Sequence, residues 1–140
     1  MAATTYGTAL IAKALFSQTT GILSLANLFF GLTTSDPTVS GALTGEPTAT
    51  GSYARVSMTN NTTNFPVANP VLNGTAITFA TSSAAWSTGA TNLAFWFVTD
   101  SATLGAGNML MSGALTTGRS VNASGVTLSF AASALSITVA

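Results

Sequence analysis

Residues 93–99 read Leu-Ala-Phe-Trp-Phe-Val-Thr, an uninterrupted apolar run with the length of a β-strand. Successive side chains of a strand alternate between its two faces, so we expect Phe95 and Phe97 on one face and Trp96 on the other. A strand that is apolar on both faces is covered on both faces. The run therefore predicts an internal strand of a β-sandwich, or a strand that a partner covers.

Further strand-like segments surround this run and are separated by Gly, Asn and Ser. The sequence predicts additional strands at 23–33, 52–59, 75–81, 108–114, 118–122, 126–130 and 135–139. Short strands at regular spacing predict an all-β fold, here an antiparallel sandwich or jelly-roll-like barrel.

The remaining segments complete a single domain, the number expected for 140 residues. Residues 8–16 have the composition and apolar spacing of one short N-terminal helix. Residues 1–7 are suited to an N-terminal arm that reaches a neighbouring molecule. Residues 34–51 and 60–72 are rich in Gly, Thr, Asn and Pro, and we expect two long loops there.

Titratable groups are scarce in this chain. It contains no His, no Cys and six charged side chains: Lys13, Asp36, Glu46, Arg55, Asp100 and Arg119. Most enzyme chemistry near pH 7 needs a titratable group, a thiolate or a metal ligand, so we expect no catalytic, metal or cofactor site. The scattered basic residues also argue against binding to nucleic acid or to an anionic membrane surface.

The low charge predicts self-association. Charged residues make up 4% of the chain, whereas about a quarter of a typical soluble protein is charged. The buried centres of protein interfaces are depleted in charge, so we expect a homo-oligomer inside a larger assembly. The alternative is a monomer with a surface rich in Ser and Thr. No stretch approaches the ~20 apolar residues of a membrane span, and Lys13 interrupts the apolar N-terminal part in a way that is atypical of a signal peptide.

The three carboxylates fit turns better than an acid–base pair. Asp36 and Glu46 both precede Pro, and Asp100 follows the apolar run at a point where a turn is expected. Catalysis of glycoside hydrolysis by two of them is the less favoured interpretation. The stretch 105–107 reads Gly-Ala-Gly, and without a βαβ context it predicts a turn and not a phosphate-binding loop.

Three residues are candidates for subunit contacts: Tyr53, Arg55 and Trp96. Arg55 lies in the predicted strand 52–59, on the face opposite Val56 and Met58 and shared with Tyr53. One interpretation pairs it with a carboxylate across an interface, where Arg is favoured. The other is an exposed Arg that protects a sheet edge from aggregation. For Trp96 and its aromatic neighbours, a sugar-binding platform is the functional alternative to a core or interface position.

Several short motifs occur in a characteristic order. They are Leu28 to Pro37, which ends in Thr-Ser-Asp-Pro, Gly51-Ser52-Tyr53-Ala54-Arg55, Ile77-Thr78-Phe79-Ala80, Trp86-Ser87, Gly107-Asn108-Met109-Leu110, Gly113-Ala114-Leu115-Thr116-Thr117 and a closing strand at 135–139. In this order the chain resembles a family of small virion structural proteins of tailed bacteriophages, variously described as tail fibre, head fibre or capsid decoration proteins.

The resemblance implies a non-enzymatic protein, made in the host cytoplasm and located in the virion. We expect a capsid decoration, or cement, protein that binds the assembled major capsid protein as an oligomer, perhaps a homotrimer, and stabilises the shell. The alternative is a tail or fibre component that contacts other tail proteins or a host receptor.

Overall fold

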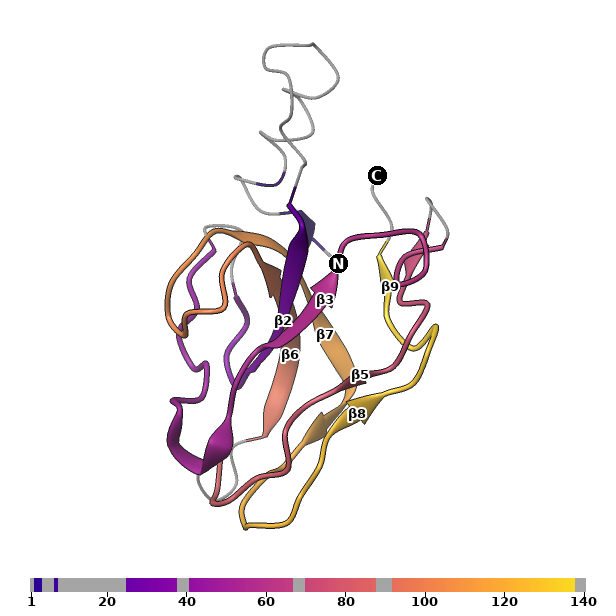
Figure 1. The fold of residues 1–140 in the computed structure, drawn as a ribbon. Coiled ribbons are helices and arrows are strands. Elements are labelled where there is room, and N and C mark those ends of the chain that lie inside the picture. The colour runs from indigo at the N-terminus through magenta and orange to yellow at the C-terminus, as the bar shows by residue number, and fades with distance from the viewer. Residues whose placement is uncertain are drawn as a thin grey trace.

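A computed structural model of the chain describes residues 2–3, 7, 25–37, 41–66, 70–87 and 92–137, which form an antiparallel β fold (Figure 1). Strands and irregular connections make up almost all of this part. The strands are β1 (Ala2–Ala3), β2 (Asn27–Thr33), β3 (Val56–Thr59), β4 (Val71–Leu72), β5 (Ile77–Thr78), β6 (Leu93–Thr99), β7 (Met109–Arg119), β8 (Ser129–Phe130) and β9 (Ser136–Ile137). A single 3₁₀ turn, η1 (Thr50–Ser52), precedes β3. The predicted all-β, antiparallel class is confirmed.

One five-stranded sheet organises the molecule, in the order β1-β7-β6-β2-β3. β6 is the apolar run 93–99, and it pairs antiparallel with β2 on one side and β7 on the other. Two short ladders, β4 with β9 and β5 with β8, complete the β structure. The large sheet is open, with β1 and β3 at its edges, so the finer expectation of a sandwich or jelly-roll-like barrel is not confirmed.

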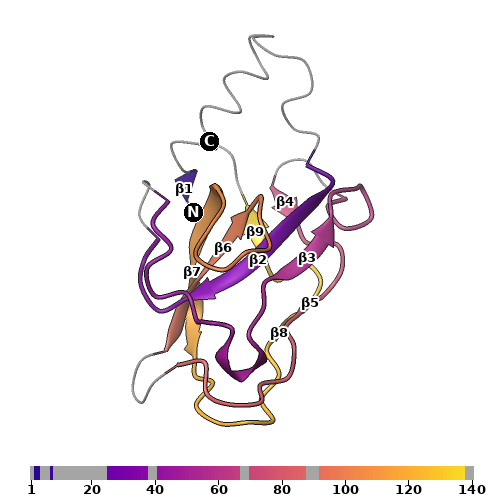
Figure 2. The same cartoon turned by 60° about the vertical axis from the view of Figure 1, so that its left-hand side comes forward.

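The main core lies between one face of the sheet and the segments that carry the short ladders (Figures 1 and 2). The sheet contributes alternate residues such as Phe30, Leu32, Trp96 and Val98. The opposite layer contributes apolar side chains from scattered positions: Ile77, Phe79, Trp86, Val121 and Leu135. Tyr53, Phe79 and Trp86 pack with ring centroids 5.3–6.2 Å apart. Burial of these side chains supplies the main driving force for folding.

The two large aromatic residues at the centre of β6 each pack on a glycine of a neighbouring strand. Phe97 lies opposite Gly31 of β2, where a Cβ atom would come within 2.2 Å of the ring. Trp96 lies opposite Gly113 of β7, where a Cβ atom would come within 2.9 Å of the indole. Because Phe97 and Trp96 occupy opposite faces, glycine makes room for one aromatic ring on each side of the sheet. Both faces of β6 are covered, as the sequence predicts.

β7 departs most from the expected strands. The sequence predicts separate strands at 108–114 and 118–122, whereas β7 is continuous from Met109 to Arg119. The predicted break appears instead as a shift in register. Ala114 pairs with Phe95 and Arg119 pairs with Leu93, so β7 uses five residue steps where β6 uses two. The Leu-Thr-Thr-Gly stretch therefore forms an irregular bulge within a strand and does not end it.

Other strands are shorter than expected. The predicted strand 52–59 begins only at Val56, because η1 includes Ser52 and residues 53–55 are irregular. The predicted strands 75–81 and 126–130 contract to β5 and β8, and the predicted loop 60–72 ends in the two-residue strand β4. Ala2–Ala3, in the expected arm, pair with β7 of the same chain as β1. The helix predicted at 8–16 lies outside the described residues, and no membrane-length apolar helix occurs in the part that is described.

Candidate functional site

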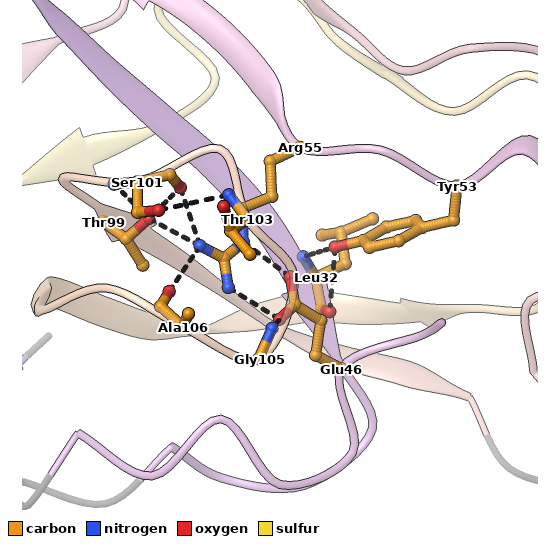
Figure 3. Close-up of polar contacts among 9 residues, drawn as sticks. All are labelled: Leu32, Glu46, Tyr53, Arg55, Thr99, Ser101, Thr103, Gly105 and Ala106. Carbon is orange, nitrogen blue, oxygen red and sulfur yellow. Dashed lines mark hydrogen bonds and ion pairs between the residues drawn. The ribbon is translucent and has the colours of Figure 1, made fainter. Parts of the chain in front are cut away.

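The most extensive polar site surrounds Arg55, on the face of the sheet opposite the main core (Figure 3). Its guanidinium forms a two-pronged ion pair with Glu46, with Nε to Oε1 and Nη2 to Oε2 distances of 2.7 Å each. The side chains of Arg55 and Glu46 are 0% and 3% exposed. The guanidinium also lies over the ring of Phe97, 5.2 Å from its centroid. This geometry combines the bidentate and stacking contacts for which Arg is suited.

The third nitrogen of Arg55 binds the turn between β6 and β7. Nη1 donates to the carbonyl oxygens of Ser101 and Ala106 at 2.7 and 2.9 Å, and to Oγ1 of Thr99 at 3.0 Å. Glu46 binds the same turn, since its Oε2 accepts a hydrogen bond from the Gly105 amide at 2.8 Å. The ion pair therefore joins three segments: the loop before η1, the start of β3 and the β6–β7 turn.

Tyr53 lies next to this site and binds the backbone at the edge of β2. The β2–β3 ladder ends with Phe30 opposite Val56, two residues before Leu32. The Tyr53 hydroxyl accepts a hydrogen bond from the Leu32 amide at 2.9 Å and donates one to its carbonyl at 3.3 Å, in place of the missing strand partner (Figure 3). Burial raises the pKa of this hydroxyl above its ordinary value, because the charged phenolate would be desolvated.

All three predicted interface residues have extensive contacts within the chain. Tyr53, Arg55 and Trp96 are 2%, 7% and 5% exposed in the single chain. The expectation that Arg55 pairs with a carboxylate matches the structure in its chemistry, but Glu46 belongs to the same chain. The alternative of an exposed edge Arg is wrong, because the side chain is buried. A role of these residues at subunit contacts stays a prediction.

Little in the sequence indicates the Arg55–Glu46 pair. The Pro after Glu46 indicated a turn, and the predicted strand placed Tyr53 and Arg55 on one face. In the structure η1 precedes the strand, which starts later than predicted. Tyr53 therefore lies in the main core, whereas Arg55 packs on Phe97. The available signal was charge scarcity: in a chain with so few charges, a buried Arg must find one of very few carboxylates.

The other carboxylates have local roles. Asp100 accepts hydrogen bonds from the backbone and side-chain amides of Asn108 at 2.7 and 2.8 Å, which confirms its predicted turn position. The Gly-Ala-Gly stretch forms part of the same turn, with positive φ at Gly105 and Gly107. Asp36 is exposed. Within the described ranges no three or more His, Cys, Asp or Glu side chains are grouped to hold a metal ion.

A second polar site is a pocket of about 310 Å³ beside the irregular part of β7. One wall consists of Ala114–Thr117 and Arg119, and the other of Phe130 and the stretch 134–136, with Trp96 between them. Its lining residues include the apolar Leu115, Phe130 and Leu135 and the polar Arg119, Thr116, Thr117 and Ser136. Among the described residues, no Asp or Glu side chain lines the pocket.

Two hydrogen-bond donors at this pocket are unused. The Arg119 side chain is exposed and makes no ion pair or hydrogen bond with any residue that the structure describes. The Trp96 indole N–H likewise donates to none of these residues. The pocket thus has a cationic side chain in its lining that pairs with no carboxylate of the described residues.

Comparison with known protein families matches residues 2–138 to the family described as "Podophage GP4 fiber I protein gp80". The match covers nearly the whole chain, including both polar sites. No curated protein sequence matches the chain.

Proposed function

We propose a function from one premise: the chain belongs to the Podophage GP4 fiber I protein gp80 family. Membership of this family identifies a small structural protein of tailed bacteriophages, in agreement with the resemblance that the sequence motifs indicate. The chain is accordingly a virion component with a β-rich fold.

Within the virion, we propose that this chain is a subunit of a fibre and contributes to host recognition. The observation that carries this proposal is the family match over residues 2–138, whose description is that of a fibre protein. The structure is compatible with this role, because a sheet covered on both faces gives a rigid support for a solvent-facing pocket. The fibre description also favours a structural over a catalytic role.

Capsid decoration is the second candidate. The chain has zero net charge and few charged residues, which favours a close contact with a large protein lattice. A decoration protein would bind the assembled shell of major capsid protein and not its dissociated subunits, and would stabilise the shell by mass action. Many weak contacts repeated over the lattice would strengthen this attachment.

We also propose that the protein acts as a homo-oligomer, with a trimer as the expected form. Low surface charge supports self-association in either location. Light scattering of the purified protein tests this proposal. The expected mass is three times the 14.0 kDa of one chain, whereas a monomer mass that does not change with concentration would contradict it.

The copy number per virion distinguishes the two locations. Quantitative mass spectrometry of purified virions gives the ratio of this protein to the major capsid protein. A fibre subunit predicts a ratio far below one, because a virion has few appendages. A ratio close to one would reject the fibre proposal and support decoration.

A further inference from the structure

We propose that the pocket beside the irregular part of β7 binds a single acidic sugar residue that carries a carboxylate. The pocket exists because β7 and β6 fall out of register. Five residue steps from Ala114 to Arg119 lie opposite two steps from Phe95 to Leu93, so the extra residues cannot remain in the ladder. Four consecutive residues of this irregular stretch, 114–117, line the pocket. Irregularities of this kind are frequent next to functional sites, where they redirect side chains.

The positive charge beside the pocket indicates that its ligand is negatively charged. Arg119 is exposed, makes no contact with a carboxylate in the described part of the chain, and shares the pocket with no acidic side chain. Arg55 provides the contrast, because Glu46, two carbonyl oxygens and a hydroxyl occupy its donors. A planar guanidinium with free donors recognises a carboxylate by paired hydrogen bonds.

The other lining groups favour a sugar over a simple inorganic anion. Trp96, Thr116, Thr117 and Ser136 line the pocket, and the polar groups that these residues carry suit a ligand with several hydroxyl groups. The half-buried ring of Phe130 and the side chain of Leu115 offer an apolar surface for the C–H face of a sugar ring. A volume of about 310 Å³ is at the lower limit for small-molecule sites and fits one ring better than an oligosaccharide.

The source of such a sugar would be a polysaccharide of the host surface, and that part of the inference rests on the proposed function. Binding of the free sugar does not depend on it. A protein that binds the sugar but has a copy number close to that of the capsid protein would retain the site and lose the fibre assignment.

The two tryptophans of the chain allow a direct test with an internal control. Trp96 lines the pocket, whereas the Trp86 N–H donates to the Gly51 carbonyl at 2.6 Å inside the core. In a ¹⁵N–¹H spectrum of the full chain, titration with glucuronate should shift the indole signal of Trp96 and leave that of Trp86 in place. Glucose, which has the same ring without the carboxylate, should bind at least about tenfold more weakly.

Arg119→Gln supplies the matched variant. Arg119 has no partner in the described structure, so this variant should fold with an unchanged melting temperature and lose glucuronate affinity by about tenfold or more. The proposal is overturned by no shift of the Trp96 signal with glucuronate, by equal affinity for glucose and glucuronate, or by an Arg119→Gln variant that binds as the wild type does.

Discussion

The two arginines that the structure describes have opposite environments. Arg55 is buried, pairs with Glu46 and binds the β6–β7 turn through two carbonyl oxygens. Arg119, at the end of β7, is exposed and has no partner among the described residues. A buried cation whose three nitrogens all donate within the chain stabilises the fold, whereas an unpaired cation beside a pocket is available to a ligand. Substitutions around Arg55 should therefore destabilise the fold, whereas substitution of Arg119 should not.

The largest effect is expected from Arg55→Met, which keeps an apolar stem on Phe97 and removes the guanidinium. It leaves the Glu46 carboxylate, 3% exposed, without its partner, and removes the Arg55 donor from the carbonyls of Ser101 and Ala106. Breaking a buried ion pair in this way costs about 3–5 kcal/mol of the free energy of unfolding. Denaturant unfolding followed by circular dichroism measures this change.

The double variant Arg55→Met/Glu46→Gln controls for the unpaired charge. It removes the buried carboxylate charge as well, so it should be more stable than Arg55→Met alone. A loss below about 1 kcal/mol in the single variant would show that the pair behaves like an exposed surface ion pair.

A substitution beneath Arg55 should have the next largest effect. In Gly31→Ala the new methyl group would come within 2.2 Å of the Phe97 ring, on which the Arg55 guanidinium lies. Forcing an extra methyl group into such a contact costs about 1–3 kcal/mol. The same unfolding experiment measures it, and the double variant Gly31→Ala/Phe97→Leu should recover part of the loss.

Gly113→Ala makes the equivalent change under Trp96, on the pocket side of the sheet. Its closest contact, 2.9 Å, is longer than that at Gly31, so we expect a smaller loss of stability. Comparison of the two glycine variants shows whether the Arg55 side is the more tightly packed. A larger loss in Gly113→Ala than in Gly31→Ala would reverse that order.

Tyr53→Phe removes the hydroxyl that satisfies both backbone groups of Leu32. The expected loss is about 1 kcal/mol, the usual contribution of a neutral hydrogen bond. Because burial raises the pKa of Tyr53 in the folded protein, its stabilising effect is complete below the ordinary tyrosine value of 10.0 and is lost as the pH rises above it.

Wild-type stability should therefore decrease above about pH 10 by as much as about 1.4 kcal/mol per pH unit from this group. The Tyr53→Phe variant lacks this contribution and should show a shallower decline. Unfolding series at several alkaline pH values measure the two slopes, and equal slopes would contradict the buried position of the hydroxyl.

The smallest effect on stability is expected from Arg119→Gln. An exposed side chain without partners contributes within about 0.5 kcal/mol, so its unfolding curve should overlay that of the wild type. A loss comparable to that of Arg55→Met would show that Arg119 is also structural, and would remove the contrast between the two arginines.

Periodicity and local composition predict part of this fold well. The apolar run 93–99 is β6 with the same bounds, both its faces are covered, and the class is antiparallel all-β. These features depend on alternation along a few residues. The sequence predicts a strand break where β7 has a bulge, because Thr and Gly are typical of both and only the pairing with β6 distinguishes them.

The sequence pattern does not predict the contacts around Arg55, because they join distant parts of the chain. Arg55 reaches Ala106, 51 residues away in sequence, and Tyr53 bonds to Leu32, 21 residues away. η1, with Gly51 and Ser52 both at positive φ, turns Tyr53 into the core before the strand starts. Strand alternation alone therefore predicts Tyr53 and Arg55 on the same face. The sequence also does not show which Arg lacks a carboxylate partner. The structure shows that Arg55 has one and that Arg119 has none among the described residues.

Immunogold electron microscopy of intact virions tests the central claim, a fibre subunit of the virion, most directly. Antibodies raised against the purified protein label its location without any assumption about copy number. The account predicts gold particles confined to the appendages. Label spread evenly over the capsid surface would contradict it and would identify the chain as a decoration protein.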